Sequence, residues 1–126
     1  MSKKILVIDD EPQIVKALKI RLESSGYEVV HAYDGKEGLK KLEEEHPDLI
    51  ILDVMMPNMD GYTFAREVKF NPDTEHIPII ILTVKEKMKD LFELEGINDY
   101  ILKPFEHQDL LNRIEKLLER KNGDNA

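Results

Sequence analysis

Short hydrophobic runs alternate along the chain with longer segments whose hydrophobic residues recur every three or four positions. Such runs are typical of buried β-strands, and they fall at 5–8, 27–32, 49–52, 79–82 and 100–102. The run at 49–52 is hydrophobic at consecutive positions, as expected for a central parallel strand that is buried on both faces. The pattern therefore predicts five strands with helices between them.

The periodic segments predict amphipathic helices. The first spans 12–25, and its hydrophobic face carries Val15, Leu18 and Leu22. A proline suits its first turn, and Gly26 follows its end. Further helices are expected at 35–46, 62–71, 88–95 and 110–118. Strand and helix thus alternate five times, which predicts an α/β fold with a parallel sheet covered by helices on both faces.

Composition limits the classes of function. The chain has 126 residues, and we expect one domain at 1–121 followed by a polar tail at 122–126. Its 18 basic and 26 acidic residues give a net charge of −8, which argues against direct binding to nucleic acid or membrane and favours metal cations and protein partners. The absence of cysteine excludes disulfides and thiolate metal sites. No run approaches the ~20 residues of a membrane span, so we expect a cytoplasmic protein.

Reactive side chains follow four of the five expected strands. They are Asp9 and Asp10 after the first strand, Asp53 after the third, Thr83 after the fourth and Lys103 after the fifth. The carboxyl ends of parallel strands meet at one edge of the sheet, where α/β proteins bind their ligands. A single aspartate at such a position is commonly a turn former or a helix cap. Four suitable strand ends together favour a functional site.

Three carboxylates in one cleft repel one another unless a pKa rises or a cation binds. Oxygen ligands without cysteine favour Mg²⁺, with Mn²⁺ also possible. A carboxylate is a poor nucleophile toward an anionic phosphoryl donor, and a divalent ion together with Lys103 would neutralise that charge. Thr83 would donate a hydrogen bond to the phosphoryl oxygen. These side chains predict a metal-dependent site that forms, holds and loses an acyl phosphate on Asp53.

The chain resembles the receiver domains of bacterial two-component response regulators, including the stand-alone single-domain type, from Lys4 to about Arg120. Three motifs carry the resemblance: VIDDE at 7–11, DLIILDVMMPNMDG at 48–61 and DYILKPF at 99–105. The resemblance implies a flavodoxin-like (βα)5 three-layer sandwich whose five parallel strands lie in the order 2-1-3-4-5. It also implies a phosphorelay function, with a sensor histidine kinase or a histidine phosphotransfer protein as the phosphoryl donor.

By this resemblance Asp53 is the phosphoacceptor. Asp9, Asp10 and Asp53 are expected to bind the metal, together with the backbone carbonyl of Met55.

The resemblance also assigns the residues that respond to phosphorylation. Thr83 and Lys103 would contact the phosphoryl group, and Thr83 and Tyr100 would form the switch pair. The bond between Lys103 and Pro104 is expected to be cis, which would direct the lysine into the site.

Two surfaces are expected to meet protein partners. The family's kinase-docking surface maps to one face of the first helix and a nearby loop, at Gln13, Ala17, Ile20, Arg21 and Phe105. The surface of the fourth helix, fifth strand and fifth helix would report the state to a downstream partner. The resemblance allows a monomer or a phosphorylation-dependent dimer. The sequence leaves open whether the domain stands alone.

Three positions bear on the phosphoryl lifetime. Val84 stands where the family usually has alanine or glycine, and its branched side chain is expected to narrow access to Asp53. Met55 and Lys85 supply no acid or amide to orient a water molecule. We therefore expect slow self-hydrolysis, and no enzymatic activity beyond the domain's own phosphorylation and dephosphorylation.

Two other functions could use the same residues. A metal-dependent aspartyl-phosphate hydrolase of the haloacid dehalogenase type is the main alternative, but it would need an aspartate where the sequence has Met55. A flavin-binding module would need a phosphate-binding loop after the first strand, where Asp9, Asp10 and Glu11 would repel a phosphate.

Overall fold

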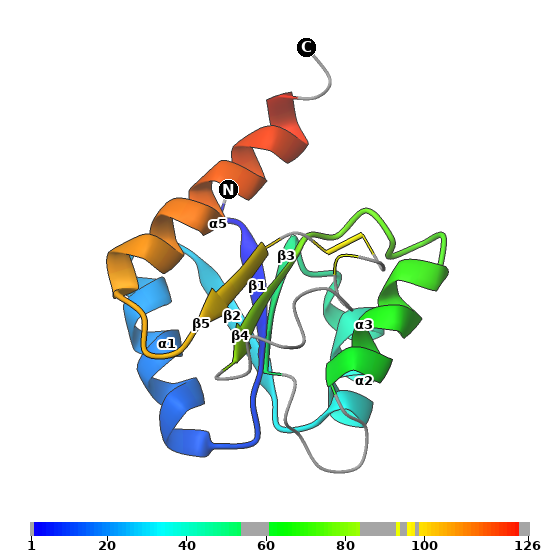
Figure 1. Cartoon of the computed structure of the whole chain (residues 1–126), viewed down its shortest axis with the longest axis horizontal. Helices are drawn as coiled ribbons and strands as arrows, with labels where there is room; N and C mark the ends of the chain where they lie inside the picture. The colour runs from blue at the N-terminus through cyan, green and yellow to red at the C-terminus, as the bar shows by residue number, and fades with distance from the viewer. Residues whose placement is uncertain (1, 54–60, 84–92, 94–95, 98, 124–126) are drawn as a thin grey trace.

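The computed structural model describes residues 2–53, 61–83, 93, 96–97 and 99–123, without the side chains of Thr83 and of 120–123. Its strands are β1 (Lys4–Ile8), β2 (Glu28–Ala32), β3 (Leu49–Asp53), β4 (Ile79–Thr83) and β5 (Asp99–Leu102). They form one five-stranded parallel sheet in the order β2-β1-β3-β4-β5 (Figure 1). The expected fold class and strand order are confirmed.

Four helices are described around the sheet: α1 (Pro12–Ser24), α2 (Gly35–Glu45), α3 (Gly61–Phe70) and α5 (His107–Gly123). The helix expected at 88–95 lies, apart from Glu93, outside the described residues. The last helix continues to Gly123, so residues 122 and 123, which we expected in the polar tail, are helical. Polar side chains can extend an exposed helix beyond its hydrophobic face, which is why hydrophobic periodicity alone placed the boundary too early.

The four described helices cover the sheet as two pairs, one on each face (Figure 1). In β1, Ile5 and Val7 pack into the core beneath α1 and α5. Leu6 and Ile8 point the other way, into the core beneath α2 and α3. This alternation follows from the two-residue period of a strand, and it explains why a central strand has hydrophobic residues at consecutive positions.

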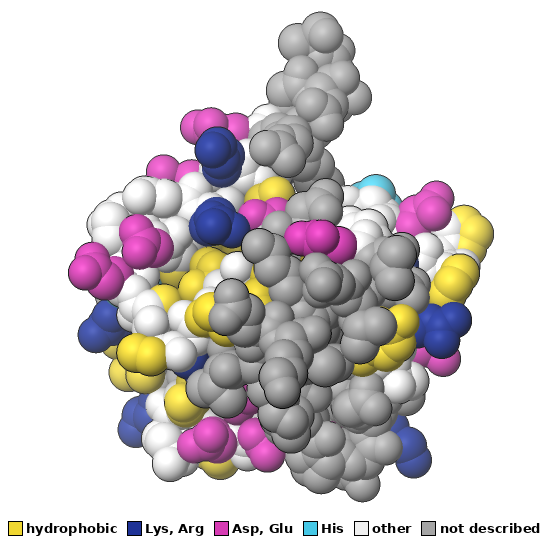
Figure 2. All heavy atoms as spheres, viewed as in Figure 1, with side chains coloured by type: hydrophobic (Ala, Val, Ile, Leu, Met, Phe, Trp, Pro, Cys, Tyr) yellow, Lys and Arg dark blue, Asp and Glu magenta, His cyan; other side chains and the backbone are white. Residues whose placement is uncertain are grey.

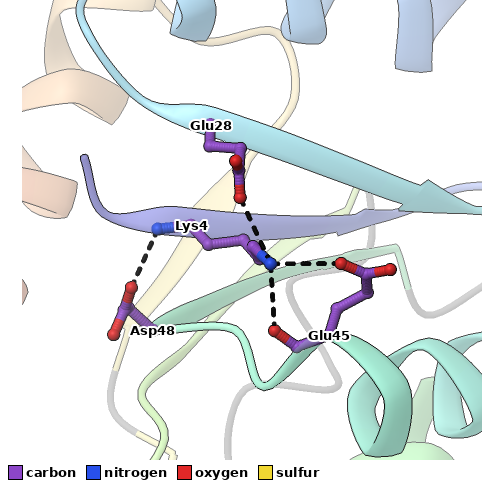
Figure 3. Close-up of polar contacts among 4 residues, drawn as sticks. All are labelled: Lys4, Glu28, Glu45 and Asp48. Atoms are coloured by element: carbon purple, nitrogen blue, oxygen red, sulfur yellow. Dashed lines mark hydrogen bonds and ion pairs between the residues drawn. The ribbon is translucent and has the colours of Figure 1, made fainter. Parts of the chain in front are cut away.

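At the amino-terminal edge of the sheet, Lys4 joins β1 to β2, α2 and the start of β3 (Figure 3). Its Nζ lies 3.2 Å from Glu28 Oε2 and 3.1 Å from Glu45 Oε1, and donates to the Glu45 carbonyl at 3.2 Å. The backbone N–H of Lys4 donates to Asp48 Oδ2 at 2.8 Å, and the N–H of Asp48 donates to the Lys4 carbonyl at 2.8 Å. Hydrogen bonds to Glu45 and Glu28 raise the pKa of the Lys4 ammonium. This network fixes the end of the sheet opposite the candidate site.

Candidate metal and phosphoryl site

The three aspartates come together because β1 and β3 are neighbouring strands. Ile8 pairs with Leu52 in the sheet, so Asp9 lies beside Asp53 where both strands end. Carboxylate oxygens of Asp9, Asp10 and Asp53 all lie within 4.8 Å of one another. Asp9 is 3% exposed and Asp53 8% exposed, whereas Asp10 is open to solvent. We call these three residues the acidic cluster.

Two hydrogen bonds hold Asp9. Its backbone N–H donates to the Ala32 carbonyl at the end of β2 at 3.2 Å, and its Oδ1 accepts from the Glu11 N–H at 3.0 Å. Glu11 itself occupies the N-cap of α1, and its side chain makes no capping hydrogen bond. The second Asp9 oxygen, Oδ2, is the one that lies near Lys103.

Lys103 reaches the acidic cluster from the end of β5. Its Nζ lies 3.5 Å from Asp53 Oδ2 and 3.6 Å from Asp9 Oδ2. The peptide bond between Lys103 and Pro104 is cis. The Lys103 ammonium thus lies close to both buried carboxylates. It comes from β5, which is separated from β1 in the sheet by β3 and β4.

Burial dominates the electrostatics of Asp9. Loss of hydration raises the pKa of its carboxyl to about 6. The Glu11 N–H opposes this increase, the charge of Asp53 reinforces it, Lys103 opposes it and Asp10 adds to it. The ionised carboxylate of Asp9 is therefore poorly stabilised by its surroundings, and a cation bound beside it would stabilise it.

The pairing of β3 with β4 and of β4 with β5 also places the other predicted residues. Asp53 pairs with Leu82 in β4, and Thr83 pairs with Leu102 in β5, so Thr83 is one residue beyond the position opposite Asp53. Tyr100 is half-buried in β5 and packs against the core beneath α2 and α3. Predictions that involve the Thr83 side chain fall outside what the structure describes. Those for Met55, Val84 and Lys85 lie outside the described residues.

A groove of about 380 Å³ extends from Lys103 along α1, and we call it the α1 groove. Four of the five residues predicted for kinase docking line it: Gln13, Ala17, Arg21 and Phe105. Ile20 is 56% exposed and does not line it.

Sequence reasoning missed His107 in the wall of the α1 groove. Burial and the charge of Arg21 lower the pKa of the His107 imidazole. The sequence did contain one indication: His107 is two residues after Phe105, which was predicted for kinase docking, and it begins the final helix.

Chemically, the cluster is suited to a hard divalent cation. Three carboxylates provide oxygen ligands at one point, and such ligands are the ones that Mg²⁺ and Mn²⁺ prefer. Asp53 also has a carboxylate oxygen beside a cationic side chain, which favours the approach of an anionic group. Within the part of the chain that the structure describes, no helix has the length and hydrophobicity to span a membrane.

The family model for the response regulator receiver domain matches residues 5–115. The chain is 45% identical over 122 residues to the alkaline phosphatase synthesis transcriptional regulatory protein PhoP of Bacillus subtilis, covering 95% of this chain and 50% of that protein. It is 48% identical over 121 residues to the probable transcriptional regulator ycf27 of Cyanophora paradoxa, covering 94% and 49%. The chain thus spans about half the length of these curated relatives.

Among solved structures, a CheY-like response regulator receiver domain protein from Methanospirillum hungatei superimposes with a TM-score of 0.91. Its sequence is 31% identical, and the match covers 98% of this chain and 99% of that one.

Proposed function

The chain belongs to the response regulator receiver domain family, whose members act in phosphorylation-based two-component signalling, and we propose that its phosphorylated residue is Asp53. The position of Asp53 is the main support. Its carboxylate lies at the end of a central strand, among two further aspartates and 3.5 Å from an ammonium. Among the described residues, Asp9, Asp10 and Asp53 form the only such group of three potential metal ligands, and Asp53 is the member of the group that lies on β3.

The proposed donor is a phosphohistidine of a sensor kinase or of a histidine phosphotransfer protein. An Asp53 carboxylate oxygen forms a bond to phosphorus while the phosphorus–nitrogen bond of the donor breaks. The electron pair of that bond stays on the imidazole nitrogen. Lys103 is placed to offset the negative charge of the phosphoryl oxygens, because its Nζ is already close to the acceptor carboxylate.

Asp9, Asp10 and Asp53 would hold the divalent ion, with the Met55 carbonyl as a further ligand proposed from the sequence alone. When bound, Mg²⁺ supplies positive charge that stabilises the transferring phosphoryl group. The raised pKa of Asp9 supports this assignment, since a buried carboxylate with two acidic neighbours is stabilised by a cation. The Glu11 N–H keeps Asp9 oriented toward the cluster.

The proposed switch uses Thr83 and Tyr100. A new phosphoryl group would offer acceptor oxygens to Thr83 and Lys103, and only the state that makes these contacts would gain free energy. Tyr100 lies in β5, two residues before Leu102, which is 40% exposed. Figure 2 shows hydrophobic side chains on the surface in the region of β5 and α5. This surface is our candidate for the downstream partner and for a phosphorylation-dependent dimer.

The α1 groove and Ile20 form the proposed docking surface for the phosphoryl donor. Lys103 lies at one end of the groove, so a partner bound there would be near Asp53. The curated relatives are named transcriptional regulators, but this chain spans about half of their length. For this chain we propose protein contacts in the cytoplasm rather than direct nucleic-acid binding, because its net charge is −8.

The decisive experiment is phosphorylation by acetyl phosphate with MgCl₂, followed by intact-mass measurement. We expect the mass of one phosphoryl group on the wild type, none on Asp53→Asn, and its loss after treatment with hydroxylamine, which cleaves acyl phosphates. Asp48→Asn is the matched control, because Asp48 lies at the opposite edge of the sheet. Phosphorylation of Asp53→Asn at the wild-type level would disprove the assignment. Catalytic turnover of small phosphoesters would favour the hydrolase alternative instead.

A further inference from the structure

A second groove lies between the end of α2 and the loop from α3 to β4, at the edge of the sheet opposite the acidic cluster. Two adjoining hollows of about 410 and 230 Å³ form it, and both are lined by Leu42, His46, Asp73 and Thr74. In Figure 1 this loop runs across the top of the molecule. Figure 2 shows acidic side chains and a histidine near the top of the α3 side. We call this feature the α2–α3 groove.

The α2–α3 groove has an acidic rim and a hydrophobic floor. Carboxylates line it at Glu43, Glu67, Asp73 and Asp48, and neither hollow has a lysine or arginine in its lining. Leu39, Leu42 and Ile77 contribute hydrophobic surface. Glu43, Glu67 and Asp73 are exposed, so their charges are available to a ligand from solvent.

The helix that forms one wall adds to the negative potential. The last turn of α2 contains Glu43, Glu44 and Glu45 and no basic residue. Acidic side chains at a helix C-terminus are unfavourable, because the helix dipole is negative there. Lys4 pairs with Glu45 on the side of β1, but it does not line the groove.

The loop that forms the other wall is held in place by hydrogen bonds with the end of α3. Lys69 Nζ donates to the carbonyls of Glu75 at 3.0 Å and Ile77 at 2.9 Å. Thr74 Oγ1 donates to the Val68 carbonyl at 2.7 Å. Burial lowers the pKa of the Lys69 ammonium, whose N–H groups are directed at backbone carbonyls. These hydrogen bonds hold the wall in place and engage the Lys69 ammonium, and the loop also places His76 in the lining of the groove.

We propose that the α2–α3 groove binds a basic segment of a partner protein, with a hydrophobic side chain on the floor and lysine or arginine side chains along the rim. Charge complementarity is the main argument, since the rim is acidic and the floor is not. The site lies away from the acidic cluster, so this inference goes beyond the phosphoryl chemistry proposed above.

Other occupants fit the groove less well. A single metal ion needs clustered ligands, but among the described residues only Asp9, Asp10 and Asp53 form a group of three that could hold one. The rim carboxylates are too widely spaced for that role and suit several separate cationic groups. A second copy of the chain has a net charge of −8 and nucleic acid carries phosphates, so neither complements the acidic rim of this groove.

The test uses the synthetic peptide amide Lys-Leu-Lys-Lys-Leu-Lys and the ¹⁵N-labelled chain. We expect chemical-shift changes concentrated in the last turn of α2 and the loop 71–78. The double variant Glu43→Gln/Glu67→Gln should weaken binding about fivefold to tenfold, as expected for two exposed charge pairs. A peptide with serine in place of leucine should also bind more weakly, because it cannot use the hydrophobic floor.

The matched control is Glu23→Gln/Glu119→Gln, which removes the same charge from exposed positions on α1 and α5. Equal weakening in both double variants would overturn the proposal, because the peptide would then be sensing overall charge alone. Shift changes centred on another surface would overturn it too, as would the same groove shifts with MgCl₂ alone or from self-association without peptide. A ¹H–¹⁵N spectrum of Glu43→Gln/Glu67→Gln that matches the wild type outside the groove would show that the variant is folded, and this readout does not depend on the Asp53 assignment.

Discussion

Lys103 lies with its Nζ 3.5 Å from Asp53 Oδ2, although the two residues are 50 positions apart in the sequence. The same ammonium is 3.6 Å from Asp9 Oδ2. It therefore occupies, in part, the electrostatic role that a divalent ion would have in this site. The Lys103 ammonium and a bound divalent ion would both interact with the carboxylates of Asp9 and Asp53. The two positive charges therefore compete for the same two carboxylates.

This competition predicts that Lys103→Met binds Mg²⁺ more tightly than the wild type. Removal of one positive charge beside the acidic cluster leaves its negative potential uncompensated, and we expect about a threefold to tenfold lower Kd. Titration calorimetry with MgCl₂ measures the effect, which should shrink at high ionic strength. Lys116→Met on the exposed face of α5 is the control. Unchanged or weaker Mg²⁺ affinity in Lys103→Met would contradict this account.

Phosphorylation of Lys103→Met should nevertheless be slower than that of the wild type, because the lysine no longer offsets the negative charge of the phosphoryl oxygens.

The raised pKa of Asp9 predicts that the ionised carboxylate, the form proposed to bind the metal, lowers the stability of the fold. Because the carboxyl is protonated more readily in the folded state, stability is greatest below the unfolded pKa and declines as pH rises from about 4 to about 6. Ionised Asp9 then lowers the free energy of unfolding by up to about 3 kcal/mol. Asp9→Asn should therefore be more stable than the wild type at pH 7.5 and nearly equal to it at pH 4.

Urea unfolding in the presence of EDTA measures this difference. Asp10→Asn is the matched control, and because Asp10 is exposed we expect a smaller gain. Addition of MgCl₂ should stabilise the wild type and leave Asp9→Asn almost unaffected. If Asp9→Asn were less stable than the wild type at pH 7.5 without metal, burial of the Asp9 carboxylate would not have the energetic cost assigned to it.

At Gly38, α2 packs tightly against Ile8 of β1 and Phe64 of α3. A Cβ added at Gly38 would lie 2.7 Å from Ile8 Cδ1 and 3.0 Å from Phe64 Cε2, and both of these side chains are fully buried. Alanine improves helix propensity by about 1 kcal/mol, but overpacking of a dense core costs about 1–3 kcal/mol. The net effect is a loss of up to about 2 kcal/mol, and the 2.7 Å approach to Ile8 Cδ1 places Gly38→Ala toward the destabilised end of that range.

A double-mutant cycle tests the stated cause. Ile8→Val removes the Cδ1 atom that is closest to the added Cβ, so it should recover part of the stability that Gly38→Ala loses. Ile8→Val alone should destabilise the wild type by about 0.5–1.5 kcal/mol. Simple additivity of the two changes in urea unfolding would show that the contact with Ile8 is not the reason.

The convergence of the site residues was predictable because it depends on two local signals. Each hydrophobic run marks a strand, and the residue that ends it is read directly from the sequence. Parallel topology then places Asp9 beside Asp53 through the pairing of Ile8 with Leu52. Neither step requires knowledge of side-chain packing, so the meeting of these residues at one edge of the sheet followed from the pattern. The strand order that makes β1 and β3 neighbours was instead implied by the family resemblance.

Other properties of the site depend on tertiary distances that no local pattern contains. The pKa of Asp9 rises because the folded chain excludes water from it, and the hydrogen bond from Glu11 only partly offsets that effect. Likewise, Leu82 from β4 and His107 from α5 line the same groove as α1, although they are far apart in the sequence. The helical state of residue 123 was missed for a different reason, since polar ends of helices lack hydrophobic periodicity.

The sequence also predicts a long-lived phosphoryl group. Hydrolysis of an acyl phosphate is faster when a side chain orients the attacking water, and Met55 and Lys85 offer neither an acid nor an amide for that purpose. Met55→Asn should shorten the half-life, and Val84→Ala should speed both phosphorylation and dephosphorylation by widening access to Asp53. Decay after removal of acetyl phosphate, followed on gels that retard the phosphorylated chain, gives these rates. A wild-type half-life of seconds would refute slow self-hydrolysis, and equal rates in the wild type and Val84→Ala would remove position 84 from the explanation.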